Sequence, residues 1–198
     1  MCGIVGYVGE NNNCVRVLID GLEKLEYRGY DSAGIAYFNN GKINILKESG
    51  KIENLKKNID LESKSNIGIG HTRWATHGVV SDKNAHPFKV GRVTLVHNGI
   101  IENYKELKEE YNLSGLKSET DSEVIAALLN EFYDGNVLET ITKVCSQLMG
   151  TYALLMMFDD KKDTIYATRH VSPLVFGYKD NEIMISSEGA PVRCILNS

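Results

Sequence analysis

The sequence predicts an α+β protein in which helices pack over antiparallel sheets. About seven or eight segments have the pattern of strands and about four have helical spacing. Asn39-Asn40-Gly41, between two strand-like segments, is a strong hairpin signal because an Asn-Gly turn tolerates positive φ. The last strands are separated only by polar turns, which predicts an antiparallel meander. The order does not alternate strand with helix, so parallel βαβ units are disfavoured.

The first half of the chain is expected to begin with a strand and a helix. Residues 3–8 form a short apolar, β-branched run, and apolar residues from Asn13 onward recur at helical spacing. Residues 33–38 and 42–47 are the two strands of the hairpin. Residues 67–72 and 92–97 are further strands, and each runs into a stretch dense in polar residues. Chemistry is expected at those strand ends.

Two consecutive helices open the second half. Thr120 and Glu123 form a capping box that starts a helix through about Phe132. A second helix is indicated by apolar residues at helical spacing and stops at Gly150; these are Val137, Ile141, Val144 and Leu148. The predicted meander then has its strands at residues 151–158, 164–168, 174–178 and 182–186.

Composition places the chain among globular proteins and excludes several function classes. Its 198 residues suit a single domain, residues 1–198. The 26 acidic and 22 basic residues give a net charge of -4, so nucleic acid is not an expected partner. No apolar run reaches the roughly 20 residues of a membrane helix, and the start lacks the features of a secretory signal. A cytoplasmic location away from membranes is expected.

Cys2 differs from the other three cysteines, which are scattered without C-x-x-C or metal-ligand spacing. Removal of Met1 would make Cys2 the N-terminal residue and give it both a thiol and a free α-amine. The thiol is nucleophilic, and an α-amine with a reference pKa of about 7.7 to 8.0 accepts a proton near neutrality. The alternative is that Cys2 is only a small residue at the start of a buried strand.

Two further motifs contain candidate site residues. Residues 28–34, Arg-Gly-Tyr-Asp-Ser-Ala-Gly, suit either a site or a simple turn. Residues 71–78, His-Thr-Arg-Trp-Ala-Thr-His-Gly, place Arg73 just past a strand, where it could hold a carboxylate bidentately. The alternative is a surface loop anchored by Trp74. No metal site is predicted, because the histidines at 71, 77, 86 and 97 lack a familiar ligand spacing.

Asn98 and Gly99 end a predicted strand and are candidates for an oxyanion hole. The side-chain amide of Asn98 and the backbone amide of Gly99 are both suitable donors. The same dipeptide also suits an ordinary turn. Asp121, at the start of the helix opened by Thr120, either binds a substrate or interacts with the helix dipole.

Together these segments resemble the class II glutamine amidotransferases, which use an N-terminal cysteine nucleophile. The resemblance is carried by residues 1–6, 28–34, 71–78, 86–88, 97–104 and 118–121. Within the class it is to the glutaminase domain of the glutamine–fructose-6-phosphate aminotransferases rather than to the amidophosphoribosyltransferases. It implies a four-layer αββα fold of the N-terminal-nucleophile hydrolases, with two antiparallel sheets between helical layers. No cofactor is expected.

The resemblance also implies the reaction. Cys2 would attack the side-chain amide of L-glutamine. Asn98 and Gly99 would stabilise the tetrahedral oxyanion while a γ-glutamyl thioester forms and ammonia leaves, and water would then release glutamate.

Substrate recognition is implied in the same way. The position matching the carboxylate ligand is Arg73, and the one matching the ammonium ligand is Asp121. Thr76 and His77 would line the same pocket. Further positions implied to lie near the site are Arg28, Gly29, Trp74 and His86.

The resemblance implies partners as well. The family's complete enzyme continues into phosphosugar-binding domains that use the ammonia to convert fructose 6-phosphate into glucosamine 6-phosphate, and any homodimer is expected to form through them. This sequence stops at Ser198, which implies a truncated glutaminase domain without the sugar-isomerase domains. Residues 187–193 depart from the Asp-containing segment expected there. A catalytically silent glutamine-binding or regulatory module is the alternative.

Overall fold

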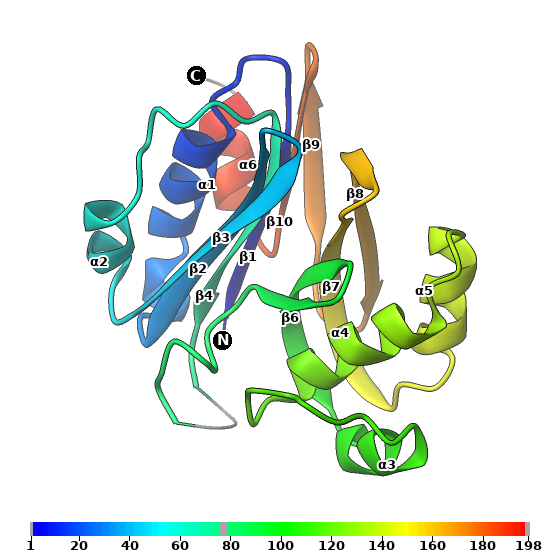
Figure 1. The fold of residues 1–198 in the computed structure, drawn as a ribbon. Coiled ribbons are helices and arrows are strands. Elements are labelled where there is room, and N and C mark those ends of the chain that lie inside the picture. The colour runs from blue at the N-terminus through cyan, green and yellow to red at the C-terminus, as the bar shows by residue number, and fades with distance from the viewer. Residues whose placement is uncertain (1, 76–78, 197–198) are drawn as a thin grey trace.

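Two antiparallel sheets face one another between two layers of helices (Figure 1). The computed structural model describes residues 2–75 and 79–196. Within these residues the larger sheet has six strands, in the order β3 (Lys42–Ser49), β2 (Ser32–Asn39), β4 (Ile67–Arg73), β1 (Gly3–Val8), β10 (Glu182–Ser186) and β9 (Val175–Lys179). The smaller has four, in the order β5 (Phe88–Val90), β6 (Val93–Ile101), β7 (Gly150–Phe158) and β8 (Lys161–His170).

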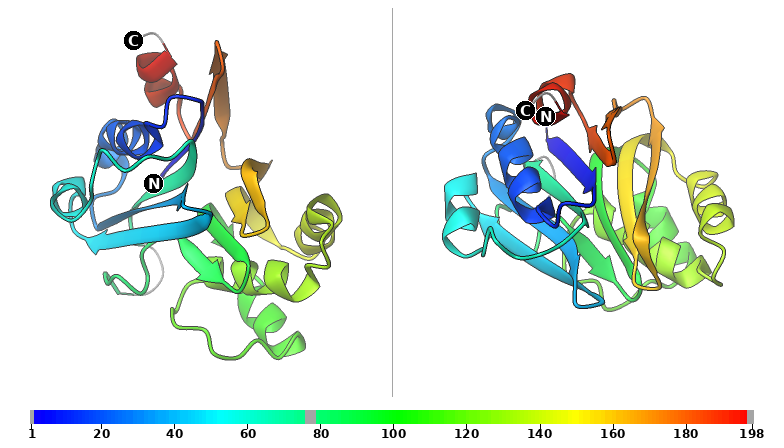
Figure 2. Two further views of the ribbon diagram at one scale, coloured as in Figure 1. Left: turned by 45° about the horizontal axis from the view of Figure 1, so that its top comes forward. Right: turned by 90° about the horizontal axis from the view of Figure 1, so that it is seen from above.

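Helices cover the outer face of each sheet, as the views in Figure 2 show. The six-stranded sheet is covered by α1 (Cys14–Glu23), α2 (Ile52–Lys57) and α6 (Gly189–Leu196). The four-stranded sheet is covered by α3 (Tyr104–Glu110), α4 (Asp121–Phe132) and α5 (Val137–Cys145). The predicted α+β class with four layers in the order αββα is confirmed.

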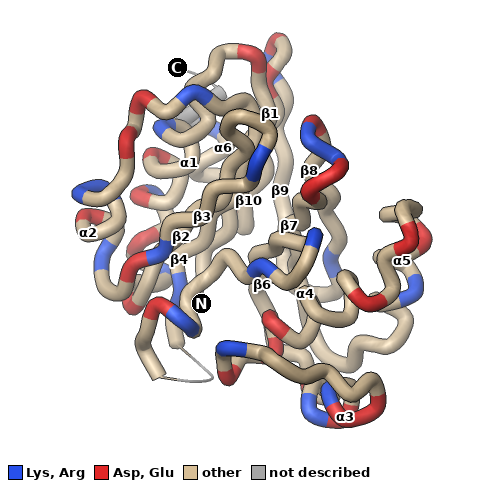
Figure 3. Tube along the Cα trace, in the orientation of Figure 1, with Lys and Arg blue, Asp and Glu red and all other residues tan. Residues whose placement is uncertain are grey.

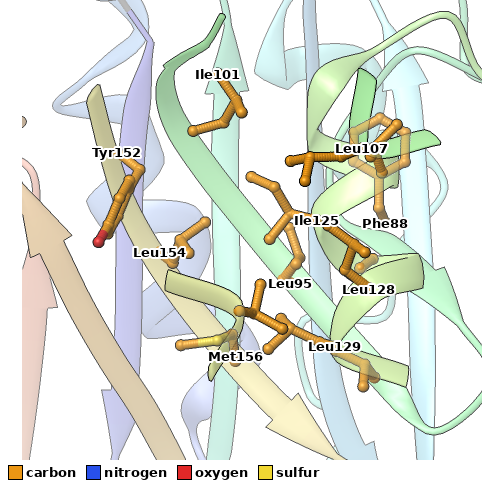
Figure 4. Close-up of a cluster of buried hydrophobic side chains, with 14 of the residues drawn as sticks. Phe88, Leu95, Ile101, Leu107, Ile125, Leu128, Leu129, Tyr152, Leu154 and Met156 are labelled. Carbon is orange, nitrogen blue, oxygen red and sulfur yellow. The ribbon is translucent and has the colours of Figure 1, made fainter. Parts of the chain in front are cut away.

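Buried apolar side chains fill the spaces between the layers. On β7, Leu154 and Met156 pack against α4, whereas Leu155 and Met157 on the opposite face pack between the sheets. Figure 4 shows the helix-side cluster, with Leu154 and Met156 near Leu129 of α4. Burial on both faces explains why β7 is a continuous apolar run in the sequence.

Charged residues lie on the outer helices. Basic and acidic residues are interspersed on α2 and α3 (Figure 3).

The hairpin prediction is confirmed. Asn39 pairs with Lys42, and the two turn residues Asn40 and Gly41 have φ of 52° and 76°. Both central residues of a type I′ turn need positive φ, which Asn and Gly adopt at least cost. The strands predicted at residues 3–8, 67–72 and 92–97 and the two consecutive helices are also present.

The four strands of the predicted meander are present, but the prediction that they form one meander is wrong. β7 and β8 pair in the four-stranded sheet, but β9 and β10 pair in the six-stranded sheet. The chain therefore crosses from one sheet to the other at residues 171–174. Local alternation marks a strand but does not say which sheet it joins, because both inner faces are apolar. Five short elements of the described chain were not predicted, none longer than eight residues: α2, α3, α6, β5 and the 3-10 helix Glu26–Arg28.

Candidate active site

Cys2 lies directly before β1, beside the end of β4. The backbone N–H of Trp74 donates to Cys2 Sγ over 3.2 Å, and the thiol lies 3.5 Å from the Trp74 carbonyl oxygen. The next residue, Gly3, donates its N–H to Thr72 Oγ1 over 3.1 Å, and a Cβ there would come within 2.6 Å of that oxygen. A larger residue at position 3 would therefore push the nucleophile candidate away from β4.

Asn98 approaches Cys2 from the other sheet. It lies on β6, and its side-chain Nδ2 donates to the Cys2 carbonyl oxygen over 3.0 Å. Its Oδ1 faces His71 Nε2, also at 3.0 Å. The two residues are 96 positions apart in the sequence, so the four-layer fold is what joins them. The thiol and the candidate oxyanion donor meet where the two sheets face each other.

Only glycine fits at position 99. Gly99 has φ of 131°, and a Cβ there would lie 2.0 Å from the Thr151 carbonyl oxygen of the neighbouring β7. That contact involves backbone, so it cannot be relieved by moving a side chain. Gly99 thus lets the Asn98-Gly99 segment lie close to β7 without a side chain over the cleft.

A cleft of about 250 Å³ opens beside these residues. Five of the predicted site residues line it: Cys2, Arg28, Trp74, Asn98 and Gly99. The remaining lining residues were not predicted, and they are Ile100, Thr151, Ser172 and Pro173. Ser172 and Pro173 belong to the crossing between the sheets, so the unpredicted turn of the chain also forms one wall of the cleft.

The environment of Cys2 favours the neutral thiol. Burial raises its pKa, and the Trp74 backbone hydrogen bond and the positive charges of Arg73 and Arg28 oppose this only in part. The thiol therefore needs a base to become a nucleophile.

Arg28 and Gly29 pack against the nucleophile's neighbours. The Arg28 side chain is buried and forms an ion pair with Glu188, which also accepts a hydrogen bond from Tyr27. A Cβ on Gly29 would lie 2.6 Å from the Arg73 carbonyl carbon, so glycine allows the two backbone segments to touch. Trp74 is 44% exposed, and its ring meets Tyr30 edge-on at 5.6 Å.

Arg73 and Asp121 lie close to this centre but are not among the residues that line the cleft. Arg73 is buried at the end of β4, where its Nη1 donates to the Val79 carbonyl oxygen over 3.3 Å. Burial lowers its pKa, and the negative charges of Asp31 and Asp121 act against that. Asp121 is buried as well and accepts a hydrogen bond from the Ile101 N–H over 2.8 Å.

The capping box places Asp121. Thr120 Oγ1 accepts from the Glu123 N–H over 3.4 Å, as predicted. The Glu123 carboxylate reaches further back, to the N–H groups of Lys117 and Ser118. Asp121 is thereby fixed in the first turn of α4, with its carboxylate beside the last residue of β6.

His86 lies in a buried histidine cluster rather than in the cleft. Its ring stacks on His71 at a centroid distance of 3.9 Å, and its Nε2 lies 3.0 Å from Ser122 Oγ. His97 Nδ1 lies 2.9 Å from the same hydroxyl. Burial lowers the pKa of all three imidazoles, that of His71 to about 3, so they are neutral at pH 7.

Several predictions concern residues outside those that the structure describes. Thr76 and His77, predicted to line the substrate pocket, are two of these, and so is Met1. In the described part of the chain no group of three or more His, Cys, Asp or Glu side chains could hold a metal ion. The described helices include none that is both long and apolar enough to cross a membrane.

Besides the four unpredicted lining residues, sequence reasoning missed Ser187, Glu188 and Ser122 near the site. Ser187 Oγ accepts from the Ile4 N–H over 3.0 Å and so holds β1, and Glu188 pairs with Arg28. Both belong to residues 187–193, the segment whose departure from the expected pattern was the only signal. Ser122 carried no signal, because a serine in a first helical turn is common.

The chain is similar to known glutamine-dependent enzymes. The glutamine amidotransferase domain family matches residues 71–193. The glutamine–fructose-6-phosphate aminotransferase of Fusobacterium nucleatum is 49% identical over 193 residues, which are 95% of this chain and 32% of that protein. The Bacillus subtilis protein of the same name is 45% identical over all of this chain and 34% of its own length. The chain thus spans about a third of these relatives.

Solved structures agree on the fold. Glutamine phosphoribosylpyrophosphate amidotransferase from B. subtilis matches 99% of this chain and 44% of its own, with a TM-score of 0.85 and 27% identity. A glutamine aminotransferase class-II domain protein from Silicibacter pomeroyi shares the fold with a TM-score of 0.61 at 15% identity. With the family match spanning more than half of its residues, the chain belongs to the glutamine amidotransferase domain family.

Proposed function

We propose that this chain is the glutaminase part of a glutamine–fructose-6-phosphate aminotransferase. It hydrolyses the side-chain amide of L-glutamine to glutamate and ammonia. The observation that carries the proposal is the 3.0 Å hydrogen bond from Asn98 Nδ2 to the Cys2 carbonyl, beside one cleft lined by both residues. The identity of 45–49% to aminotransferases of that name, against 27% to the phosphoribosylpyrophosphate amidotransferase, supports fructose 6-phosphate as the ammonia acceptor of the complete enzyme.

The reaction begins at the Cys2 thiol. After removal of Met1 the free α-amine of Cys2 takes the thiol proton, which compensates for the raised pKa of the thiol. Sγ then bonds to the side-chain carbonyl carbon of glutamine, and the carbonyl oxygen becomes an oxyanion. Asn98 Nδ2 and the Gly99 N–H donate hydrogen bonds to that oxygen. The protonated amine returns its proton to the departing nitrogen, and ammonia leaves.

The second half of the reaction regenerates the enzyme. The remaining γ-glutamyl thioester is attacked by water, with the α-amine again accepting a proton. The thioester bond breaks, glutamate leaves, and the proton returns to Sγ. No redox step and no cofactor enter this sequence.

Arg73 and Asp121 hold the amino-acid end of glutamine. Arg73 binds the α-carboxylate and Asp121 the α-ammonium, and the negative charge of Asp121, which acts to raise the pKa of Arg73, supports a shared pocket. Both side chains also bond to backbone groups in this structure, Arg73 to the Val79 carbonyl and Asp121 to the Ile101 N–H. Thr76 and His77 complete the pocket in this proposal.

The reaction that uses the ammonia is assigned to domains outside residues 1–198. Relatives of the same name are about three times as long, and we assign the phosphosugar-binding domains, and any homodimer contact, to that additional length. Ammonia released by this chain alone then has no sugar to enter.

The test is a product assay on chain whose N-terminus is verified by mass spectrometry. Incubation with glutamine and fructose 6-phosphate should yield glutamate and ammonia in equal amounts and no glucosamine 6-phosphate. Sugar product would refute the division of labour. Glutamine binding without glutamate release, from protein that begins at Cys2, would support a silent binding module instead.

A further inference from the structure

The buried side chain of His71 touches the candidate oxyanion donor. His71 lies on β4 and is fully buried, and its Nε2 lies 3.0 Å from Asn98 Oδ1 and 3.0 Å from the His97 carbonyl oxygen. Its ring is held flat against His86. In the described part of the chain His71 Nδ1 has no hydrogen-bond partner.

The His97 carbonyl decides where the His71 proton lies. A backbone carbonyl oxygen is only an acceptor, so Nε2 at 3.0 Å from it must be the protonated ring nitrogen. Burial keeps the ring neutral, with a pKa of about 3, and Nδ1 therefore carries no proton. This assignment does not depend on how the Asn98 amide is turned.

The protonated Nε2 in turn decides the orientation of Asn98. With Oδ1 toward His71, the amide accepts one hydrogen bond and donates another to the Cys2 carbonyl. In the reversed orientation its NH₂ would face the His71 N–H, and its oxygen would face the Cys2 carbonyl oxygen. Two donors and two acceptors would then be opposed in a partly buried setting, which disfavours the reversed orientation.

We propose that His71 is a positioning residue, which holds the Asn98 amide with Nδ2 turned toward Cys2 and the cleft. The inference rests on the proposed role of Asn98 in stabilising the oxyanion. Asn98 lies on β6 of the four-stranded sheet, whereas His71 lies on β4 of the six-stranded sheet. The orientation of the Asn98 donor is therefore set by a residue of the opposite sheet.

Steady-state kinetics of glutamate release provide the test, on chain with a verified Cys2 N-terminus. His71→Leu removes the donor and should lower kcat on the order of 10- to 100-fold, with KM within about twofold, because only the transition-state donor is misdirected. His71→Gln offers an amide N–H near the same point and should recover most of the loss. Thr94→Val is the matched control, since it alters a buried residue on β6 whose hydroxyl has no partner, and it should keep parental kcat.

A double-mutant cycle separates this inference from the proposed function. If His71 acts through Asn98, His71→Leu should cost less than about twofold once Asn98→Ala is present. The positioning role would be overturned if His71→Leu lowered kcat equally in both backgrounds, or if His71→Gln had a kcat as low as that of His71→Leu. Either result would leave the oxyanion role intact. Parental turnover of Asn98→Ala alone would instead remove the oxyanion role on which the inference rests.

A spectroscopic measurement needs no substitution at all. In protein labelled with ¹⁵N-histidine, His71 should show the neutral Nε2–H tautomer from pH 8 to pH 5. An Nδ1–H tautomer, or a charged ring in that range, would refute the hydrogen-bond assignment even if the leucine variant failed to fold.

Discussion

The two ends of the proposed site are built differently. The reaction end consists of Cys2, Asn98 and Gly99, which line the cleft and are joined directly by a hydrogen bond. The recognition end consists of Arg73 and Asp121, which are buried beside the cleft and bonded to backbone groups. The reaction end therefore lies open on the cleft, whereas the recognition end is buried and also serves backbone groups of the protein. Changes at the first should affect turnover, and changes at the second should affect binding.

The largest effect is expected from residues placed before Cys2. A peptide bond converts the basic α-amine into a non-basic amide, so glutamate release should fall by at least about 10³-fold. The matched control places a protease site directly before Cys2, so that cleavage restores both the free amine and the activity. Unchanged activity before cleavage would show that the α-amine is not the base.

Asn98→Ala should lower kcat by on the order of 10² to 10³ and leave KM nearly unchanged. The reason is that an oxyanion donor acts mainly in the transition state. Initial-rate measurements over a range of glutamine concentrations separate the two constants. A raised KM with parental kcat would move Asn98 to the recognition end.

Gly99→Ala tests the backbone of the reaction end. The new Cβ would meet the Thr151 carbonyl oxygen and the residue would keep an unfavourable φ, so we expect the free energy of unfolding to fall by about 3 kcal/mol or more. Gly115→Ala is the control, because Gly115 has φ of 74° but open space around its Cβ position. That variant should lose only about 1 kcal/mol. Equal losses in urea unfolding would show that the close approach to β7 is unimportant.

Arg73→Lys probes the recognition end. Lysine keeps the charge but loses the planar fork, so KM for glutamine should rise about 10- to 100-fold with a smaller change in kcat. Asp121→Asn should act in the same direction by weakening ammonium binding. Binding of glutamine to both variants with parental affinity, measured by calorimetry, would contradict the assignment of this pocket.

Beyond the two ends of the site, the stability of the chain should depend on pH. His71, His86 and His97 have lowered pKa values in the folded chain, so the unfolded chain binds more protons below its histidine pKa of about 6.5. The contribution of His71 to stability is complete above that pH and is lost as pH falls toward 3, and those of His86 and His97 decline in the same direction. For His71 the slope should reach about 1.4 kcal/mol per pH unit. Urea unfolding at pH 7.5, 6 and 5 measures it, and His86→Gln should reduce the slope.

Sequence reasoning located the reaction end better than its surroundings. Cys2 directly precedes β1 and lines the cleft, as do Asn98 and Gly99. The prediction that Asn98 and Gly99 end a strand is wrong, because β6 continues past them to Ile101 and both residues pair with β7. The proximity of Cys2 and Asn98 followed from the family resemblance, because no local pattern relates positions 96 residues apart. The domain extent of residues 1–198 stays a prediction.

What could not be predicted depends on contacts between distant segments. Ser122 bridges His86 and His97 only because α4 packs beside β6, and neither residue's neighbours in sequence indicate that contact. The crossing at residues 171–174 likewise depends on the pairing of β9 with β10 in the six-stranded sheet. Short helices such as α2 and α3 present too few turns for a clear apolar period.

The central position of β1 has a consequence for the motions of the site. Segments next to a chain end usually fray, but β1 is paired with β4 on one side and β10 on the other, and Ser187 also holds Ile4. Opening β1 would require breaking both ladders. The two ladders therefore hold the nucleophile in place, and the amide protons of residues 3–8 should exchange with solvent as slowly as those of the protein's interior.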